Sequence, residues 1–150
     1  MSADEAWAVI EAAHTGIVTT LRHDGVPIAL PVWFVALDRR ICFAGPARTK
    51  KFARLRNDPR VSFLVEAGNA WAELVGVHLT GRASMLDAGD RLDAVTAALQ
   101  AKYERFRTPR PAMPSETRAV YESATTTVEI VPDERILSWD NARLFAGEER

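Results

Sequence analysis

GPARTKKFARLRNDPR, residues 45–60, is the stretch that combines a fold signal with an unusual distribution of charge. Thr49 is a helix N-cap residue and the Asp-Pro pair at 58–59 stops a helical run, so we expect a short helix that begins at Thr49. Arg48, Lys50 and Lys51 crowd the end of this helix that already carries a partial positive charge, and each such cation costs about 0.3–1 kcal/mol. Free N–H groups, a hydroxyl and three cations at one point predict an anion site for a phosphate. The alternative is a basic face that solvent covers.

A second expected helix obeys the electrostatic rule that the first one breaks. Asp87 is a candidate N-cap, and the acidic residues Asp90 and Asp93 lie near this end, whereas Lys102 and Arg105 lie near the other end. Apolar residues recur at helical spacing, which predicts that the helix packs on a sheet. They are Leu92, Val95, Leu99 and Phe106.

Length and composition are those of one ordinary soluble domain that spans residues 1–150. The chain has 150 residues, of which 47% are hydrophobic and 26% are charged, and its formal net charge is −1. No global basic field therefore recruits nucleic acid. The lone cysteine, Cys42, excludes an internal disulfide and fits a reducing cytoplasm. The N-terminus is acidic and no apolar run approaches 18 residues, so we expect neither a signal peptide nor a membrane span.

The remaining chain predicts a short opening helix and six strands. Ser2 and Glu5 have capping-box spacing, and we expect Gly16 to end the helix that they start. Alternating or apolar runs bounded by turn residues predict strands at 16–21, 28–37, 41–44, 60–65, 70–85 and 125–138. The proline-rich segment 107–114 is expected to be a loop.

No set of residues predicts acid–base, nucleophilic or metal chemistry. The three histidines (His14, His23 and His78) lack metal-ligand spacing, so we expect no metal site. Glu73 and Glu129 lie in expected strands and are interpreted as rim residues or ion-pair partners. Aromatic residues in strands, such as Trp33 and Trp71, can stack on a flat ring but are more often core residues. Any catalysis is therefore expected to come from a bound cofactor.

Four short motifs together resemble the pyridoxamine 5′-phosphate oxidase-like split β-barrel family of flavin and deazaflavin proteins. They are GVP at 25–27, PVWF at 31–34, TKK at 49–51 and RVS at 60–62. The resemblance implies a mainly β, α+β fold: a six-stranded antiparallel split barrel with short flanking helices. It also implies a homodimer with two cofactor sites between the subunits, and a small-molecule acceptor as the further partner.

The resemblance also implies a set of cofactor-binding residues. Thr49, Lys50 and Lys51 match the phosphate signature of the family. The strand from Ile28 to Val32 matches the one whose backbone follows the cofactor ring, and the next contact matches Ala44 and Gly45. The cofactor-binding residues implied on the first segment are Leu30, Pro31, Val32 and Trp33. Trp139 and Arg143 match, more loosely, a tryptophan and an arginine near the C-terminus of the family.

Departures from the oxidase pattern indicate which cofactor is bound. The FMN-dependent oxidases have Arg and Lys bounding the second strand and Gln in the long strand, whereas this chain has Pro27, Val32 and Gly76. PVWF and the Trp139-Asp140 pair are more similar to the actinobacterial branch that uses coenzyme F420. We therefore expect a cytoplasmic reductase that transfers hydride from reduced F420 to an electron-poor organic acceptor. The alternatives are an FMN-dependent oxidoreductase and a non-catalytic module that binds flavin, F420 or haem.

Overall fold

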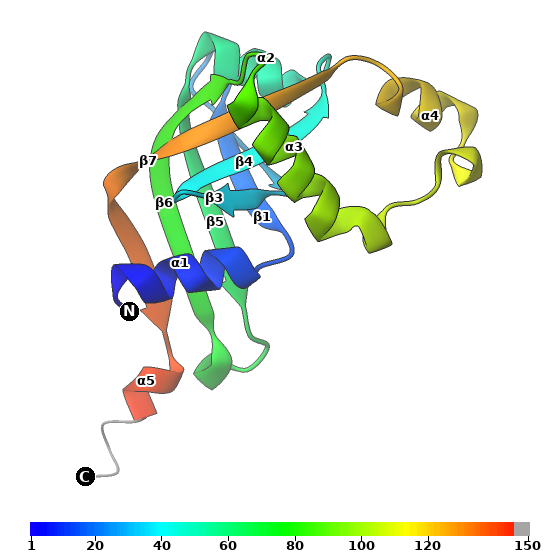
Figure 1. Ribbon diagram of the computed structural model, residues 1–150. Helices are drawn as coiled ribbons and strands as arrows, with labels where there is room; N and C mark the ends of the chain where they lie inside the picture. Colours follow the sequence, from blue (N-terminus) through cyan, green and yellow to red (C-terminus); the bar gives the residue numbers. More distant parts are fainter. Residues whose placement is uncertain (146–150) are drawn as a thin grey trace.

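An antiparallel sheet that curls into a half-barrel organises the chain (Figure 1). The computed structural model describes residues 1–145, and its strands follow the order β2-β1-β5-β6-β7-β4-β3. The strands are β1 (Gly16–Leu21), β2 (Pro27–Val32), β3 (Val35–Leu37), β4 (Arg40–Pro46), β5 (Arg60–Ala67), β6 (Val75–Met85) and β7 (Thr125–Asp140). The fold is thus α+β and mainly β as expected, but the described residues form seven strands and not six.

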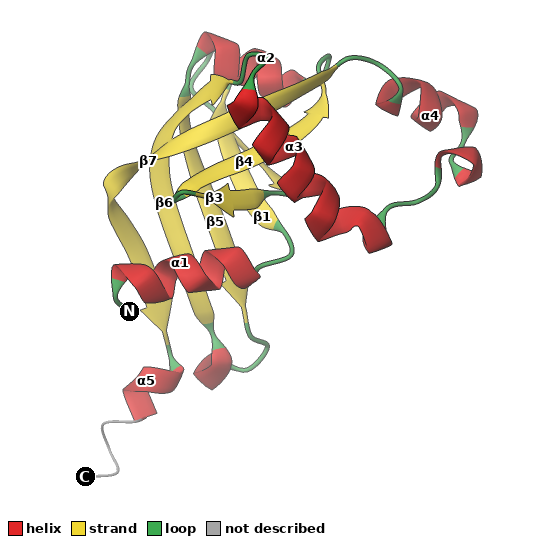
Figure 2. Ribbon diagram, in the orientation of Figure 1, coloured by secondary structure: helices red, strands yellow, loops and turns green. Residues whose placement is uncertain are grey.

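Helices flank the curled sheet (Figure 2). They are α1 (Ala3–Ala12), α2 (Lys50–Asn57), α3 (Asp90–Tyr103), α4 (Ser115–Tyr121) and α5 (Ala142–Phe145). Short 3₁₀ turns lie at Trp71–Glu73, Glu104–Phe106 and Arg110–Ala112. Within residues 1–145, the longest of these helices falls short of the length and apolarity that a bilayer crossing requires.

Two apolar clusters lie on opposite sides of β4. The alternation along β6 turns Val77, Leu79 and Ala83 inward, where they join Ile10 of α1 and Phe52 of α2 in the main core. The second cluster lies beneath α3. Its members are Val35, Cys42, Val95, Leu99 and Tyr103. Helices α1 and α2 therefore close the inside of the half-barrel, whereas α3 covers the outside of β3 and β4.

The extra strand arises because the expected strand at 28–37 breaks at Trp33 and Phe34. The hydroxyl of Tyr103 in α3 accepts from the Phe34 N–H at 2.8 Å and lies 2.8 Å from the Phe34 carbonyl oxygen. Lys102 Nζ also donates to that carbonyl, at 3.0 Å. Both backbone polar groups of Phe34 therefore bond to the end of α3, and β2 and β3 become separate strands.

Three other expected boundaries are wrong. The 70–85 strand begins only at Val75, because the Glu73 carboxylate accepts from the N–H groups of Asn69 and Ala70 and favours a 3₁₀ turn. Helix α3 begins after Gly89 and not at Asp87, since the Leu86 N–H still donates to the Thr127 carbonyl and keeps the chain extended.

The third boundary is that of the opening helix. Helix α1 ends at Ala12, whereas Gly16 is the first residue of β1 and does not stop the helix. Its start is confirmed, because the Ser2 and Glu5 side chains form the reciprocal capping box. Helix α4, which follows the proline-rich segment 107–114, was not predicted.

Tyr103→Phe is expected to destabilise the protein by about 1–3 kcal/mol, because it leaves the buried Phe34 N–H without an acceptor. The measurement is the free energy of unfolding in urea. The matched control is Tyr121→Phe, since Tyr121 is 49% exposed. Equal stability of the two variants would show that the Tyr103 hydroxyl does not hold the break between β2 and β3.

Candidate functional site

The N-terminus of α2 follows directly from the end of β4. Residues 47–49 connect the two elements, and Thr49 occupies the N-cap position that the sequence predicts. The turn is held by backbone bonds from the Thr49 N–H to the Pro46 carbonyl and from the Ala47 N–H to the Ala124 carbonyl. The expected helix end is also confirmed, because Asp58 is the C-cap residue.

The hydroxyl of Thr49 does not cap the helix. Its Oγ1 atom is buried and has no hydrogen-bond partner within residues 1–145. The first turn of α2 contains no acidic side chain that could replace the cap. A buried hydroxyl and the first N–H groups of a helix are therefore available together, which suits a phosphate that accepts hydrogen bonds from both.

Cations gather around this helix end without a counter-charge. No ion pair joins Arg48, Lys50 or Lys51 to a carboxylate within the described part of the chain. Burial, followed by the charge of Arg54, lowers the pKa of Lys51 below its usual range. Arg54 is itself fixed, because its Nε donates to the buried Thr20 Oγ1 at 2.7 Å. Burial thus makes the charged form of Lys51 less favourable than it is in water, and a nearby anion would offset this effect.

The chain approaches Lys51 closely at Gly45 of β4. A Cβ atom at position 45 would lie 3.4 Å from Lys51 Nζ, so a glycine leaves this side of the lysine open. These four residues, Arg48, Thr49, Lys50 and Lys51, form a candidate phosphate site, which we call the anion site, and Gly45 lies beside it.

The pairing between β3 and β4 stops next to the anion site. Val35 pairs with Cys42, and the same register would set Trp33 opposite Ala44 and Val32 opposite Gly45. These pairs do not form among the described ladders, although the opposite edge of β4 pairs with β7 as far as Pro46. We call this interrupted ladder, between residues 31–33 and 44–46, the split. In the extrapolated register, Pro31, Val32 and Trp33 follow the break on one strand, and Ala44 and Gly45 lie on the other.

Aromatic side chains fix the shape of the split at Trp33. The Trp33 indole stacks on the Tyr103 ring at 4.5 Å and an interplanar angle of 1°, and Trp33 remains 38% exposed. Leu30, three residues before Trp33, is 39% exposed, whereas Val32 is buried. One face of the Trp33 indole therefore packs on Tyr103, and part of the rest of the side chain is exposed to solvent.

Trp139 and Arg143 lie far from the anion site of the same chain. β7 pairs with Gly45 through Thr126, and Trp139 follows 13 residues later, about 40 Å along an extended strand. Arg143 already pairs with Glu5 at 2.8 Å and with Asp140 at 2.9 Å. The structure thus places Gly45 beside Lys51 of the anion site, whereas these two residues lie elsewhere in the chain.

The oxidase pattern has a glutamine where this chain has Gly76, and the structure gives a reason for the difference. Gly76 pairs with Trp139, and a Cβ atom at position 76 would overlap the indole ring of Trp139. The place that a side chain of residue 76 would occupy is therefore taken by Trp139.

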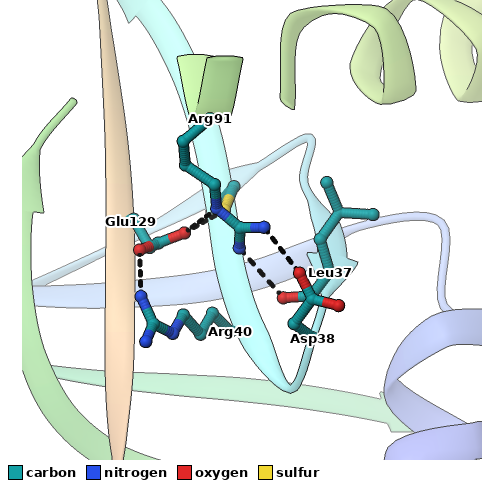
Figure 3. A network of polar contacts seen from close by, with 6 residues as sticks. Leu37, Asp38, Arg40, Arg91 and Glu129 are labelled. Atoms are coloured by element: carbon teal, nitrogen blue, oxygen red, sulfur yellow. Dashed lines mark hydrogen bonds and ion pairs between the residues drawn. The ribbon is translucent and has the colours of Figure 1, made fainter. Parts of the chain in front are cut away.

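Glu129 is a structural ion-pair partner, as the sequence suggested. Its carboxylate accepts from Arg40 Nη1 at 2.7 Å and from Arg91 Nε at 2.6 Å, and Figure 3 shows the two guanidinium groups on two sides of it. Arg91 also pairs with Asp38 at 2.7 Å, which holds the β3–β4 turn where Asp38 and Arg39 have positive φ. This network stabilises the junction of α3 with β4 and β7.

Nothing in this network has the properties of a catalytic group. Burial, together with the neighbouring Glu129 charge, raises the pKa of Cys42 to about 12, so its thiol stays protonated. Burial alone would raise the pKa of Glu129, but Arg40 and Arg91 outweigh it and lower the pKa. Within residues 1–145 no group of histidine, cysteine and acidic side chains could hold a metal ion.

Three parts of the site region were not predicted from the sequence. Arg54 was not assigned, although it follows Lys51 by three residues and so shares its helix face. Tyr103 was also missed, although it continues the Val95–Leu99 spacing by one turn; Phe106, which was expected in that face, is instead 45% exposed. Neither the α4 segment nor its position beside Thr49 carried a sequence signal.

Comparisons with known proteins agree with this architecture. A model of the pyridoxamine 5′-phosphate oxidase family matches residues 2–132. A conserved hypothetical protein from Mycobacterium tuberculosis is 29% identical, with a TM-score of 0.79, and the match covers 97% of this chain and 88% of that one. No curated protein matched the sequence.

Two further solved structures share the fold at lower identity. An FAD-binding protein from Mesorhizobium loti is 19% identical, with a TM-score of 0.69 and coverage of 92% of this chain and 93% of that one. The haem storage protein HutZ from Vibrio cholerae is 14% identical, with a TM-score of 0.68 and coverage of 90% and 92%.

Glu129→Gln is expected to lower the free energy of unfolding at pH 7 by about 1–3 kcal/mol, because two arginines lose a buried counter-charge but remain partly exposed. The folded pKa of Glu129 lies below the ~4.3 of an unfolded glutamate, so its stabilising effect is complete above about pH 4.3 and is lost as pH falls through the folded pKa. Urea titrations should therefore show the variant and the native protein converging in acid. Glu134→Gln, an exposed change on the same strand, is the control. A deficit that stays constant down to low pH would contradict the ion-pair account.

Proposed function

Since the chain belongs to the pyridoxamine 5′-phosphate oxidase family, we propose that it is a reductase that uses coenzyme F420 on an electron-poor organic acceptor. The observation that supports it best is the uncapped, unpaired cationic N-terminus of α2 beside the split. Reduced F420 would supply the hydride, and the acceptor would gain two electrons. The side chains named below would bind and orient the cofactor and exclude water.

Each part of the proposed site has a distinct task. Thr49, Lys50 and Lys51 would hold the phosphate, through the hydroxyl, the helix N–H groups and the ammonium groups. The backbone of Leu30 to Val32 on one side of the split, and of Ala44 and Gly45 on the other, would flank the ring. Trp33, which is already stacked on Tyr103, would supply a rigid wall at little entropic cost.

F420 is favoured over FMN by the positions at which this chain departs from the oxidase pattern. Pro27 and Val32, which bound β2, offer no cation, and the overlap at Gly76 leaves no place for an amide side chain there. A deazaflavin reductase that relies on stacking and backbone contacts is consistent with this apolar lining. An FMN-dependent oxidoreductase and a non-catalytic binding module are the alternative functions.

We also propose a homodimer in which each cofactor site draws on both subunits. Ile17, Leu64, His78 and Leu137 occupy paired positions across β1, β5, β6 and β7. The three aliphatic members belong to neither core cluster, and Leu137 is 56% exposed. A second copy packed on this outer face would bury them. Its Trp139 and Arg143 would then be candidates for the site that they cannot reach within their own chain.

Binding and turnover assays separate the candidate functions. The purified protein is titrated with F420 and with FMN, and oxidation of each reduced cofactor is followed with a panel of quinones, enones and tetrapyrroles. We expect tighter binding of F420 and turnover of at least one acceptor. Tight binding of any of these ligands without turnover of an acceptor would instead identify a binding module.

Lys51→Ala is expected to weaken cofactor binding about 10-fold to 150-fold, since a charge-assisted contact to phosphate is worth about 1.5–3 kcal/mol. The apo-protein should remain as stable or become slightly more stable, because a partly buried cation leaves the positive end of a helix. Isothermal titration and urea unfolding measure the two effects. Arg105→Ala is the control and should leave affinity unchanged. A less stable apo-protein with unchanged affinity would make Lys51 a structural charge and would remove the anion site.

A further inference from the structure

A pocket adjoins the anion site and shares Arg48 and Thr49 with it. It has a volume of about 340 Å³ and lies between the β4–α2 connection and the segment of α4 that precedes β7. Its lining residues are Pro46, Arg48, Thr49, Ala119, Val120 and Ser123. Figure 1 shows why these segments meet: the chain loops away from the sheet after α3 and returns through α4 to the start of β7.

Hydrogen bonds and strand pairing fix both walls of the pocket. The Ala47 N–H donates to the Ala124 carbonyl at 2.8 Å, which ties the α2 connection to the end of the α4 segment. Pro46 pairs with Thr125 in the sheet, so the two walls are continuous with β4 and β7. The Ser123 hydroxyl donates to the Val120 carbonyl and thereby closes the last turn of the α4 wall.

Thr49 belongs to both the pocket and the anion site. Its buried Oγ1 lacks a hydrogen-bond partner within residues 1–145, and the residue lines the pocket, whereas Lys51 lies near Gly45 and is not part of the lining. A phosphate at the start of α2 would therefore adjoin this pocket. The volume is near the lower limit for ligand pockets, so it suits part of a larger ligand and not a second whole cofactor.

We infer that this pocket receives a substituent carried by the cofactor phosphate, so that the chain binds a substituted phosphate and not a terminal one. The inference rests on the proposed function and extends it past the phosphate. F420, whose phosphate carries an acidic tail, and FAD, whose phosphate carries an adenylate, both meet this description. FMN, whose phosphate is terminal, would leave the pocket without a ligand.

The lining indicates how such a substituent would be held. Pro46, Ala119 and Val120 provide apolar contact, and Arg48 is the charged residue of the lining. Arg48 is exposed and forms no ion pair with a carboxylate of residues 1–145, so it can pair with an anionic group of the ligand. An acidic tail would use the charge of Arg48, whereas an adenine ring would use the apolar wall and could stack on the guanidinium.

Ala119→Trp tests the inference by filling the pocket from an exposed helix position. The dissociation constants of FMN, FAD and F420 are measured by isothermal titration for the native protein and the variant. We expect the variant to lose about 10-fold or more in affinity for F420, FAD or both, and less than about 2-fold for FMN, where 10-fold corresponds to about 1.4 kcal/mol. Ala112→Trp, in the 3₁₀ turn before α4 and outside the pocket lining, is the control and should change none of the three.

Arg48→Ala distinguishes the two sources of the substituent. A loss for F420 that shrinks at high salt, with little change for FAD, identifies an acidic tail, and the reverse identifies the nucleotide. Unchanged affinities for both F420 and FAD in Ala119→Trp, or an equal loss for FMN, would overturn the inference and leave the proposed function intact. Failure of the native protein to bind any of the three cofactors would overturn the proposed function as well.

Discussion

The hydrogen bonds that Tyr103 and Lys102 make to Phe34 determine how the two edges of the sheet meet. If the β3–β4 register continued by one pair, Phe34 would lie opposite Phe43 and the ladder would extend toward the anion site. The N–H and carbonyl of Phe34 bond instead to the last turn of α3, and Lys102 Nζ lies 4.1 Å above the Phe34 ring. No ladder therefore joins β2 to β4 along the split, and the Trp33 indole packs on Tyr103.

Charge pairing separates the structural part of the molecule from the candidate site. Arg40 and Arg91 share Glu129, Arg60 pairs with Asp58, and Arg143 pairs with two carboxylates. The cations at the start of α2 have no such partners within residues 1–145. The chain as a whole contains 20 acidic and 19 basic residues, so acidic side chains are not scarce. A cluster of cations at the positive end of a helix is unfavourable by itself, and an anionic ligand would offset this cost.

Local signals predicted most of the fold, and tertiary contacts account for the errors. The capping box at Ser2, the strand 16–21 and the helix between Thr49 and Asp58 were predicted because neighbouring residues determine them. The break at Phe34 depends on a hydroxyl 69 positions away, and the start of α3 depends on a bond between Leu86 and Thr127. No local pattern carries such information.

The same distinction holds for the candidate site. Arg48, Thr49, Lys50 and Lys51 could be grouped from the sequence because they are consecutive in the chain, and the structure places them at the start of α2. Their binding of a phosphate stays a prediction, as does the assignment of the two sides of the split to one cofactor ring. The loosely matched Trp139 and Arg143 lie elsewhere in the monomer, where Arg143 is held by Glu5 and Asp140. Their assignment to the cofactor depends on a second subunit, which one chain does not contain.

A mixed dimer tests most directly whether one cofactor site draws on two subunits. Chains with Lys51→Ala and chains with Arg143→Ala, carrying different affinity tags, are produced together, and the mixed species is isolated through both tags. One of its two sites would combine a native Lys51 with a native Arg143 from the other chain. The account predicts that the mixed dimer binds one cofactor per dimer with native affinity, whereas each parent binds weakly. Mixed dimers that bind as weakly as both parents, or an Arg143→Ala parent with native affinity, would contradict it.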